Sequence, residues 1–159
     1  MKLRFLCMSH RNELEHNLEK ALRFFQAGFD TGHFYLARSE WSDAIPHLGC
    51  AFETSEILLT KSSTENEFAS SCYWLTTSAL LLASSFSYEN YIEEAEDVIW
   101  MTINRLERQL AHNPGQILAL SEHLEKLYSE LKTYISDGSL THHSSYTKPQ
   151  ISDVNWLIH

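Results

Sequence analysis

Apolar residues recur at steps of three and four through most of this sequence, which is the spacing of amphipathic helices. The first helix is predicted over residues 9–38, where this period continues. The apolar faces of four further predicted helices cover residues 44–59, 68–86, 92–110 and 117–134. Residues 1–8 are expected to be a frayed lead-in or a short strand, and no pairing partner for a strand is evident.

Polar breaks between the apolar runs indicate where helices begin. Ser42 is the preferred cap of the second helix, because Pro46 then falls in the first turn, where its missing N–H costs nothing. Thr64 and Glu67 have the spacing of a capping box at the start of the third helix. These signals predict a short connection before each of the two helices.

The apolar pattern of the third predicted helix and the end signals of the fifth indicate where these helices lie and where they begin and end. The third, over 68–86, is apolar on nearly all sides, so it is expected in the middle of the molecule. The fifth is expected to begin with Asn113 as its cap and Pro114 at its first position, and to end at Asp137–Gly138. The predicted fold class is therefore all-α, with about five antiparallel helices.

Small and large apolar residues follow the same order at two places in the chain. Around Ala44 they are Gly32, Tyr35, Trp41 and Leu48, and at equivalent distances around Ala95 they are Ala83, Phe86, Ile92 and Ile99. This order resembles the tetratricopeptide repeat (TPR), in which small residues let two helices cross closely. The resemblance covers about residues 25–56 and 74–107, and it implies helical hairpins stacked as an α–α superhelix. An ordinary antiparallel helix bundle is the competing interpretation, because its core has a similar period.

A TPR-like fold implies a groove lined by the first helix of each hairpin. The matching positions are Gln26, Phe29, His33, Leu36 and Ala37 in the first unit, and Thr77, Leu80, Ser84, Ser87 and Tyr88 in the second. None is Lys or Arg, so the cationic clamp with which family members hold a peptide's terminal carboxylate is missing. An apolar strip edged by hydroxyl groups suits an apolar or amphipathic segment of a partner protein.

The chain is expected to divide into a TPR-like helical domain over 1–138 and a tail over 139–159. The end of the tail is apolar and would be unusual in water; its residues include Ile151, Val154, Trp156 and Leu157. It is therefore a candidate to dock, either into the groove or against a second copy in a homodimer. Whether the groove is open, or filled by the fifth helix or the tail, stays undecided at this point.

Composition narrows the possible functions. The formal net charge of −9 argues against nucleic acid as the main partner, because phosphate backbones require clustered Lys and Arg. The three cysteines match neither a disulfide framework nor a zinc pattern, and neither a signal peptide nor a membrane span is evident. The protein is therefore expected in the cytoplasm, without a membrane partner. In size and class it resembles bacterial secretion chaperones with such repeats.

The sequence shows no convincing catalytic constellation. The nine histidines include no i,i+4 pair of a helical zinc site, so neither a metal nor another cofactor is expected. Arg11 and His16 resemble the Arg-x4-His signature of HEPN nucleases, which implies RNA cleavage as the enzymatic alternative. The favoured prediction is a non-enzymatic adaptor or chaperone-like module that binds a protein or peptide in its apolar groove.

Overall fold

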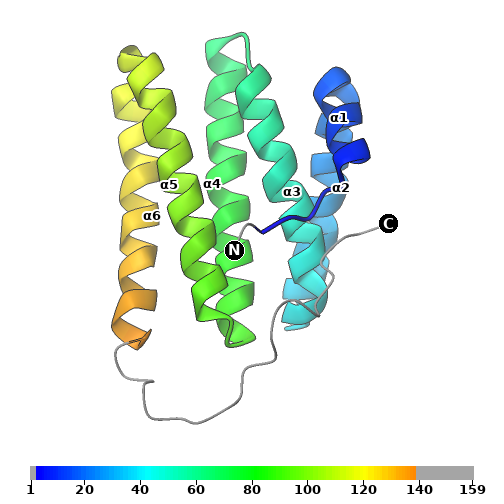
Figure 1. The fold of residues 1–159 in the computed structure, drawn as a ribbon, viewed down its shortest axis with the longest axis vertical. Helices are drawn as coiled ribbons and strands as arrows, with labels where there is room; N and C mark the ends of the chain where they lie inside the picture. Colours follow the sequence, from blue (N-terminus) through cyan, green and yellow to red (C-terminus); the bar gives the residue numbers. More distant parts are fainter. Residues whose placement is uncertain (1–2, 139–159) are drawn as a thin grey trace.

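Six α-helices and one 3-10 turn make up most of residues 3–138, the part of the chain that the computed structural model describes (Figure 1). The helices are α1 (Met8–His16), α2 (Leu18–Leu36), α3 (Trp41–Lys61), α4 (Glu65–Tyr88), α5 (Ile92–His112) and α6 (Ile117–Gly138). The 3-10 turn, η1, spans Pro114–Gln116. The predicted all-α class is confirmed, with one helix more than expected. None of these helices combines the length and hydropathy needed to cross a membrane.

Helices α2 to α6 run up and down, and each packs against the next one in the chain (Figure 1). Helix α4 contacts α3, α5 and α6, and it buries side chains around most of its circumference. This confirms the expectation that the third apolar run lies in the middle of the molecule. In Figure 1, α3 and α5 lie nearer the viewer than α2 and α4.

The first predicted helix is in fact two helices, α1 and α2, separated at Asn17. The Asn17 side chain accepts a hydrogen bond from the Lys20 N–H at 3.0 Å and so caps α2. The backbone of Asn17, at φ −139° and ψ 88°, is not helical. The prediction of one uninterrupted helix was wrong, because a local side-chain cap competed successfully with continuation of the helix.

The start of α3 also differs from the prediction. Glu40, and not Ser42, occupies the N-cap position, so Pro46 lies inside the helix beyond its first turn. The reason is the turn before it: Ser39 adopts φ 58°, and the Glu40 N–H bonds back to the Tyr35 carbonyl at 3.0 Å. This turn reverses the chain before Ser42, so α3 begins at Trp41. As a result, one backbone hydrogen bond inside the helix is missing at Pro46.

The turn between α4 and α5 has the same construction as the turn between α2 and α3. Asn90 adopts φ 64°, and the Tyr91 N–H bonds to the Phe86 carbonyl at 2.8 Å. Each of these residues stands 51 positions after its equivalent in the first turn. The two hairpins therefore share their turn geometry, while their assignment to the TPR family stays a prediction.

Two other predicted helix boundaries had different outcomes. The capping box is confirmed: Thr64 Oγ1 accepts the Glu67 N–H at 3.2 Å, and the Glu67 carboxylate accepts the Thr64 N–H at 3.3 Å. Pro114 begins a 3-10 turn, but Asn113 does not cap it with its side chain. That amide instead donates to the Gln109 carbonyl at 3.3 Å, at the end of α5.

Residues 3–7, which precede α1, are not frayed. Leu3, Phe5 and Leu6 are buried, and the segment lies across the front of α3 (Figure 1). The buried Glu53 carboxylate of α3 accepts the backbone N–H groups of Phe5 and Leu6, at 2.8 and 3.1 Å. The expectation of a lead-in without a partner was wrong, because its backbone pairs with a side chain and not with a strand.

Phe5 fits against α3 because position 49 is a glycine. A Cβ atom on Gly49 would lie 2.0 Å from Cδ1 of the Phe5 ring. The ring then extends toward Phe86 of α4, with 6.5 Å between the ring centroids. The start of the chain is therefore part of the core. The predicted tail and its docking residues lie outside the described part of the chain.

Candidate functional site

An apolar cavity of about 400 Å³ lies where the beginnings of α2 and α4 meet the end of α3. Leu18 and Leu22, one turn apart on α2, form one wall and remain 43% and 40% exposed. Leu58 and Trp74 contribute further apolar surface from α3 and α4. The other lining residues are Glu19, Lys61, Ser62, Asn66, Glu67, Ser70 and Ser71. Although polar residues are numerous in the lining, most of the surface exposed to the cavity is apolar, which is typical of a binding site.

Local sequence signals position this cavity. The Asn17 cap fixes the first turn of α2, and the Thr64–Glu67 capping box fixes the first turn of α4. The Phe25 ring of α2 lies against Trp74 of α4, with 5.2 Å between centroids. This aromatic contact joins the two helices next to the cavity, since Trp74 also lines it.

The charged groups around this cavity are mainly acidic. Glu19 forms an ion pair with Arg23 on the exposed side of α2. Glu67 is held by the capping box, and hydrogen bonds from the backbone and hydroxyl of Ser63 keep the pKa of its carboxyl below the usual value. Lys61 contributes one cation to the lining. A carboxylate therefore stays ionised beside the apolar surface at neutral pH.

The residues predicted for the groove lie on α2 and α4, except Ala37, which follows the end of α2; none of them lines this cavity. Gln26, His33, Ala37 and Tyr88 are exposed, whereas Phe29, Leu36, Thr77, Leu80, Ser84 and Ser87 are half-buried. Phe29 stacks on Phe25 at 5.4 Å and contacts His33 at 4.8 Å. Tyr88 stacks on Trp41 of α3, with centroids 3.9 Å apart. Several of these side chains are thus engaged with their neighbours.

On the same two helices, the cavity residues 18–22 and 66–74 precede the predicted positions 26–37 and 77–88. Leu18 and Leu22 fall within the predicted first helix, residues 9–38, and were not among the residues predicted to bind. The signal that could have found them is the Asn17 cap, which begins a new helix at Leu18. Side chains in the first two turns of a helix at the edge of the molecule have fewer neighbours to cover them, so Leu18 and Leu22 stay partly exposed.

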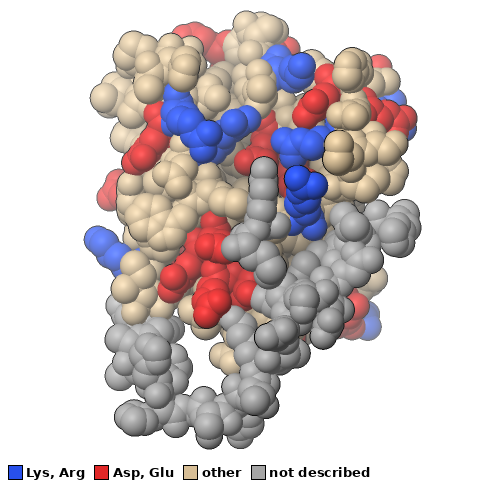
Figure 2. Space-filling view, in the orientation of Figure 1, with Lys and Arg blue, Asp and Glu red and all other residues tan. Residues whose placement is uncertain are grey.

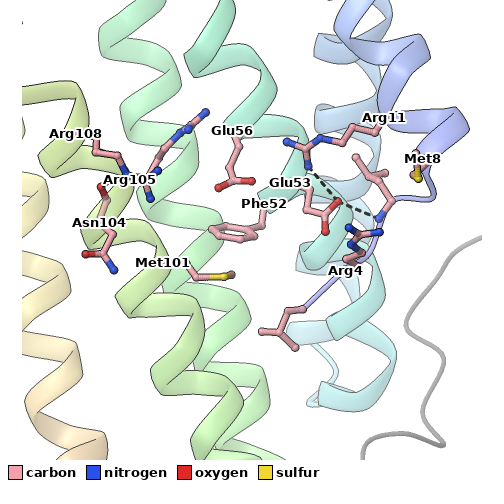
Figure 3. A pocket seen from close by; sticks show the side chains of 12 residues that line it. Arg4, Met8, Arg11, Phe52, Glu53, Glu56, Met101, Asn104, Arg105 and Arg108 are labelled. Atoms are coloured by element: carbon pink, nitrogen blue, oxygen red, sulfur yellow. Dashed lines mark hydrogen bonds and ion pairs between the residues drawn. The ribbon is translucent and has the colours of Figure 1, made fainter. Parts of the chain in front are cut away.

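A second cavity, of about 510 Å³, lies on the face with the N-terminal segment (Figure 3). Four arginines line it: Arg4 and Arg11 from the N-terminal segment and α1, and Arg105 and Arg108 from α5. The remaining lining residues are Leu3, Leu6, Met8, Phe52, Glu53, Glu56, Met101 and Asn104. In Figure 2, which shows this face, Lys and Arg gather at two places with Asp and Glu between and below them.

Glu53 is the buried acid of this second cavity. Besides the two N–H groups it accepts, its carboxylate lies 3.8 Å from Arg11 Nη1. Burial raises the pKa of this carboxyl, and the backbone hydrogen bonds and Arg11 oppose that rise in part. Glu53 thus holds the N-terminal segment, which forms one wall of the cavity.

The geometry gives no support to a nuclease pair. Arg11 pairs with Glu15 at 3.2 Å and with Glu53, whereas the His16 ring bonds to the Asn12 carbonyl at 2.7 Å. Five residues along an α-helix correspond to about 140° of rotation, so the two side chains leave α1 in different directions.

The three cysteines differ in their surroundings. Cys50 and Cys72 are buried, and burial raises the pKa of the Cys72 thiol to about 12. Cys7 is exposed, with its sulfur 3.4 Å from His10 Nδ1. Over residues 3–138, no group of three or more His, Cys, Asp or Glu side chains is arranged to hold a metal ion. Comparisons with protein-family models, curated proteins and solved structures gave no match.

Proposed function

We propose that this chain is a non-enzymatic module that binds a protein or peptide, and that the cavity between α2 and α4 receives the partner. The observation that carries this proposal is the exposure of Leu18 and Leu22 beside Trp74 in an apolar cavity of about 400 Å³. A free cavity of this kind leaves apolar surface in water, and covering it with an apolar side chain is favourable.

The form of this surface favours an amphipathic helix as the bound segment. Leu18 and Leu22 stand one turn apart on an open helix face, so apolar residues at three- and four-residue spacing can pack between them and Trp74. Glu19 and Glu67 flank the apolar surface, and the whole chain carries a net charge of −9. A partner segment with Lys or Arg on its polar face is therefore complementary.

The acidic charge also favours a different protein over a second copy of this chain. Two copies would bring like charges together at the rim of the cavity, which opposes association. The TPR resemblance implies a groove on the first helices of the hairpins, and the proposed cavity lies on the same two helices but at other positions. Helices α2 and α4 are the first helices of the two hairpins described above.

Site-specific photo-crosslinking in the full-length chain tests this proposal. A photoreactive amino acid replaces the exposed Asn66, which lines the cavity, and a control replaces the exposed Thr133 on α6. We expect the probe at position 66 to cross-link one partner segment that has apolar residues at helical spacing and nearby Lys or Arg. We expect this product to disappear in the Leu22→Glu variant and to be missing from the probe at position 133.

Two outcomes would contradict the proposal. One is a set of cross-linked proteins that is the same for both probe positions, because this indicates nonspecific contact. The other is a product from position 66 that persists in Leu22→Glu. A cross-link between two copies of the chain would replace the proposed heterologous partner with a homodimer.

A further inference from the structure

The second cavity concentrates the positive charge of an acidic protein. The chain contains 12 Lys and Arg against 21 Asp and Glu, yet four of those cations line this one cavity. Two carboxylates, Glu53 and Glu56, share it. Its side chains therefore carry a formal charge of +2 in a chain with a net charge of −9. A local excess of this sign attracts anions.

Three of the four arginines could still form an ion pair with a bound anion. Within residues 3–138, Arg11 pairs with Glu15 and Glu53, but Arg4, Arg105 and Arg108 form no ion pair. Arg105 donates to Thr60 Oγ1 through one terminal nitrogen, and its Nε is buried without a hydrogen-bond partner in the same part of the chain. An unpaired buried donor is costly, so a bound anion that draws the Arg105 guanidinium into the cavity and pairs this N–H would remove that cost.

The arginines of α5 stand close to apolar side chains. Figure 3 shows Arg105 and Arg108 on one side of the cavity, Arg4 and Arg11 on the other, and Phe52 and Met101 between them. A ligand that fills this space meets guanidinium groups at both ends and apolar surface between them. The volume of about 510 Å³ is in the range of sites for small organic molecules.

We propose that this cavity binds a small organic phosphate, with its phosphoryl group at Arg105 and Arg108 and its apolar body against Met101 and Phe52. Guanidinium groups donate two parallel hydrogen bonds to phosphate oxygens, which suits a pair of arginines one turn apart on a helix. A phosphomonoester carries nearly two negative charges at pH 7, which matches the excess of two positive charges in the lining. This site is separate from the α2–α4 cavity, so its test is independent of the proposed function.

Phenyl phosphate is a suitable probe, because it combines a phosphomonoester with a small apolar body. Titration into the full-length chain, followed by NMR, should move the arginine Nε–H signals of Arg105 and Arg108 and the methyl signal of Met101. Inorganic phosphate should move the two arginine signals at higher concentration and leave Met101 nearly unchanged. Phenol alone should not bind measurably.

Two cavity variants and one matched control make the test specific. Arg105→Gln and Arg108→Gln each remove one guanidinium and should weaken phenyl phosphate binding about tenfold or more. Arg23→Gln removes an equally charged group on the exposed face of α2, outside the cavity, and should leave the affinity unchanged. Thermal unfolding of each variant without ligand shows that any loss is not a folding defect.

The following results would overturn this proposal. Phenyl phosphate could leave the Arg105, Arg108 and Met101 signals unmoved, or Arg108→Gln could bind it as tightly as the parent protein. Equal binding of phenyl phosphate and of the carboxylate phenylacetate would show a general anion site and not a phosphoryl site. Binding only to phosphatidylcholine vesicles that contain phosphatidic acid would show a membrane surface site instead.

Discussion

The Glu53 carboxylate accepts the backbone N–H of Phe5 at 2.8 Å, across 48 positions of sequence. With the second hydrogen bond from Leu6, this fixes the N-terminal segment on α3. The segment in turn supplies Arg4 and several apolar residues to the arginine-lined cavity. One buried acid therefore connects the packing of the chain's start with the formation of a candidate site.

Ionisation of Glu53 should make the stability of the protein depend on pH. Burial raises the folded-state pKa of this carboxyl above its ordinary value of 4.5, so folding favours the protonated form. This contribution to stability is complete below the unfolded pKa and is lost as the pH rises through the folded pKa. We predict that the free energy of unfolding falls more steeply from pH 4.5 upward in the parent protein than in Glu53→Gln.

Urea unfolding at a series of pH values measures this difference directly. Gln keeps the size of the side chain and removes its titration, so the pH-dependent part that belongs to Glu53 is the difference between the two curves. If the free energy of unfolding depends on pH in the same way in the parent and in Glu53→Gln, burial does not shift the pKa of this carboxyl.

Gly49→Ala should destabilise the fold although alanine is the better helix former. The new methyl group would lie 2.0 Å from the Phe5 ring, so either the ring or the helix must move. We predict a loss of about 1–3 kcal/mol, which is typical of an overpacked core. Gly115→Ala is the control, since a Cβ at that position meets nothing within 4 Å and should be nearly neutral.

The effect of Gly49→Ala on stability should change from destabilising to stabilising when the Phe5 ring is removed. In a Phe5→Ala background the methyl group has space, and alanine should then stabilise α3 by up to about 1 kcal/mol. Chemical denaturation of the four proteins gives the coupling between positions 5 and 49. A stabilising Gly49→Ala in the parent background would contradict the close packing of Phe5 on Gly49.

Ser39→Gly should stabilise the turn between α2 and α3. Ser39 has φ 58°, a left-handed conformation that glycine adopts without the clash of a Cβ atom. After the greater freedom of glycine in the unfolded chain is subtracted, we predict a gain of about 0.5 kcal/mol. Asn90→Gly should gain less, because asparagine tolerates this conformation better. Thermal unfolding measures both, with the helical Ser42→Gly as a control that should lose stability.

Local patterns in the sequence were sufficient for the all-α class and for the central position of α4. The period of three and four residues depends on side chains within one helix, and the Thr64–Glu67 capping box depends on four consecutive residues. The break at Asn17 was missed because the apolar period continues across it, while a single capping side chain ends the helix. The anchoring of Phe5 was missed because its partner lies in a distant helix.

The candidate sites were predicted less completely than the fold. The repeat pointed to α2 and α4, and these two helices do border the apolar cavity. The position of the cavity depends on how the capped starts of α2 and α4 pack beside the Phe25–Trp74 contact. This packing cannot be predicted from the spacing of apolar residues. The arginine-lined cavity requires residues from the beginning of the chain and from α5, so only the folded structure brings them together.

The affinity of the cross-linked partner segment, prepared as a peptide, is the most direct test of the cavity between α2 and α4. It should be measured by calorimetry for the full-length parent, Leu22→Glu and Ile135→Glu, two variants that place the same charge on partly exposed apolar positions. We predict that Leu22→Glu weakens binding about tenfold or more, because the carboxylate loses water on contact with the apolar face of the peptide. Ile135→Glu, which lies outside the cavity on α6, should bind like the parent. Equal affinity of the parent and a folded Leu22→Glu would contradict the assignment of this cavity as the binding site.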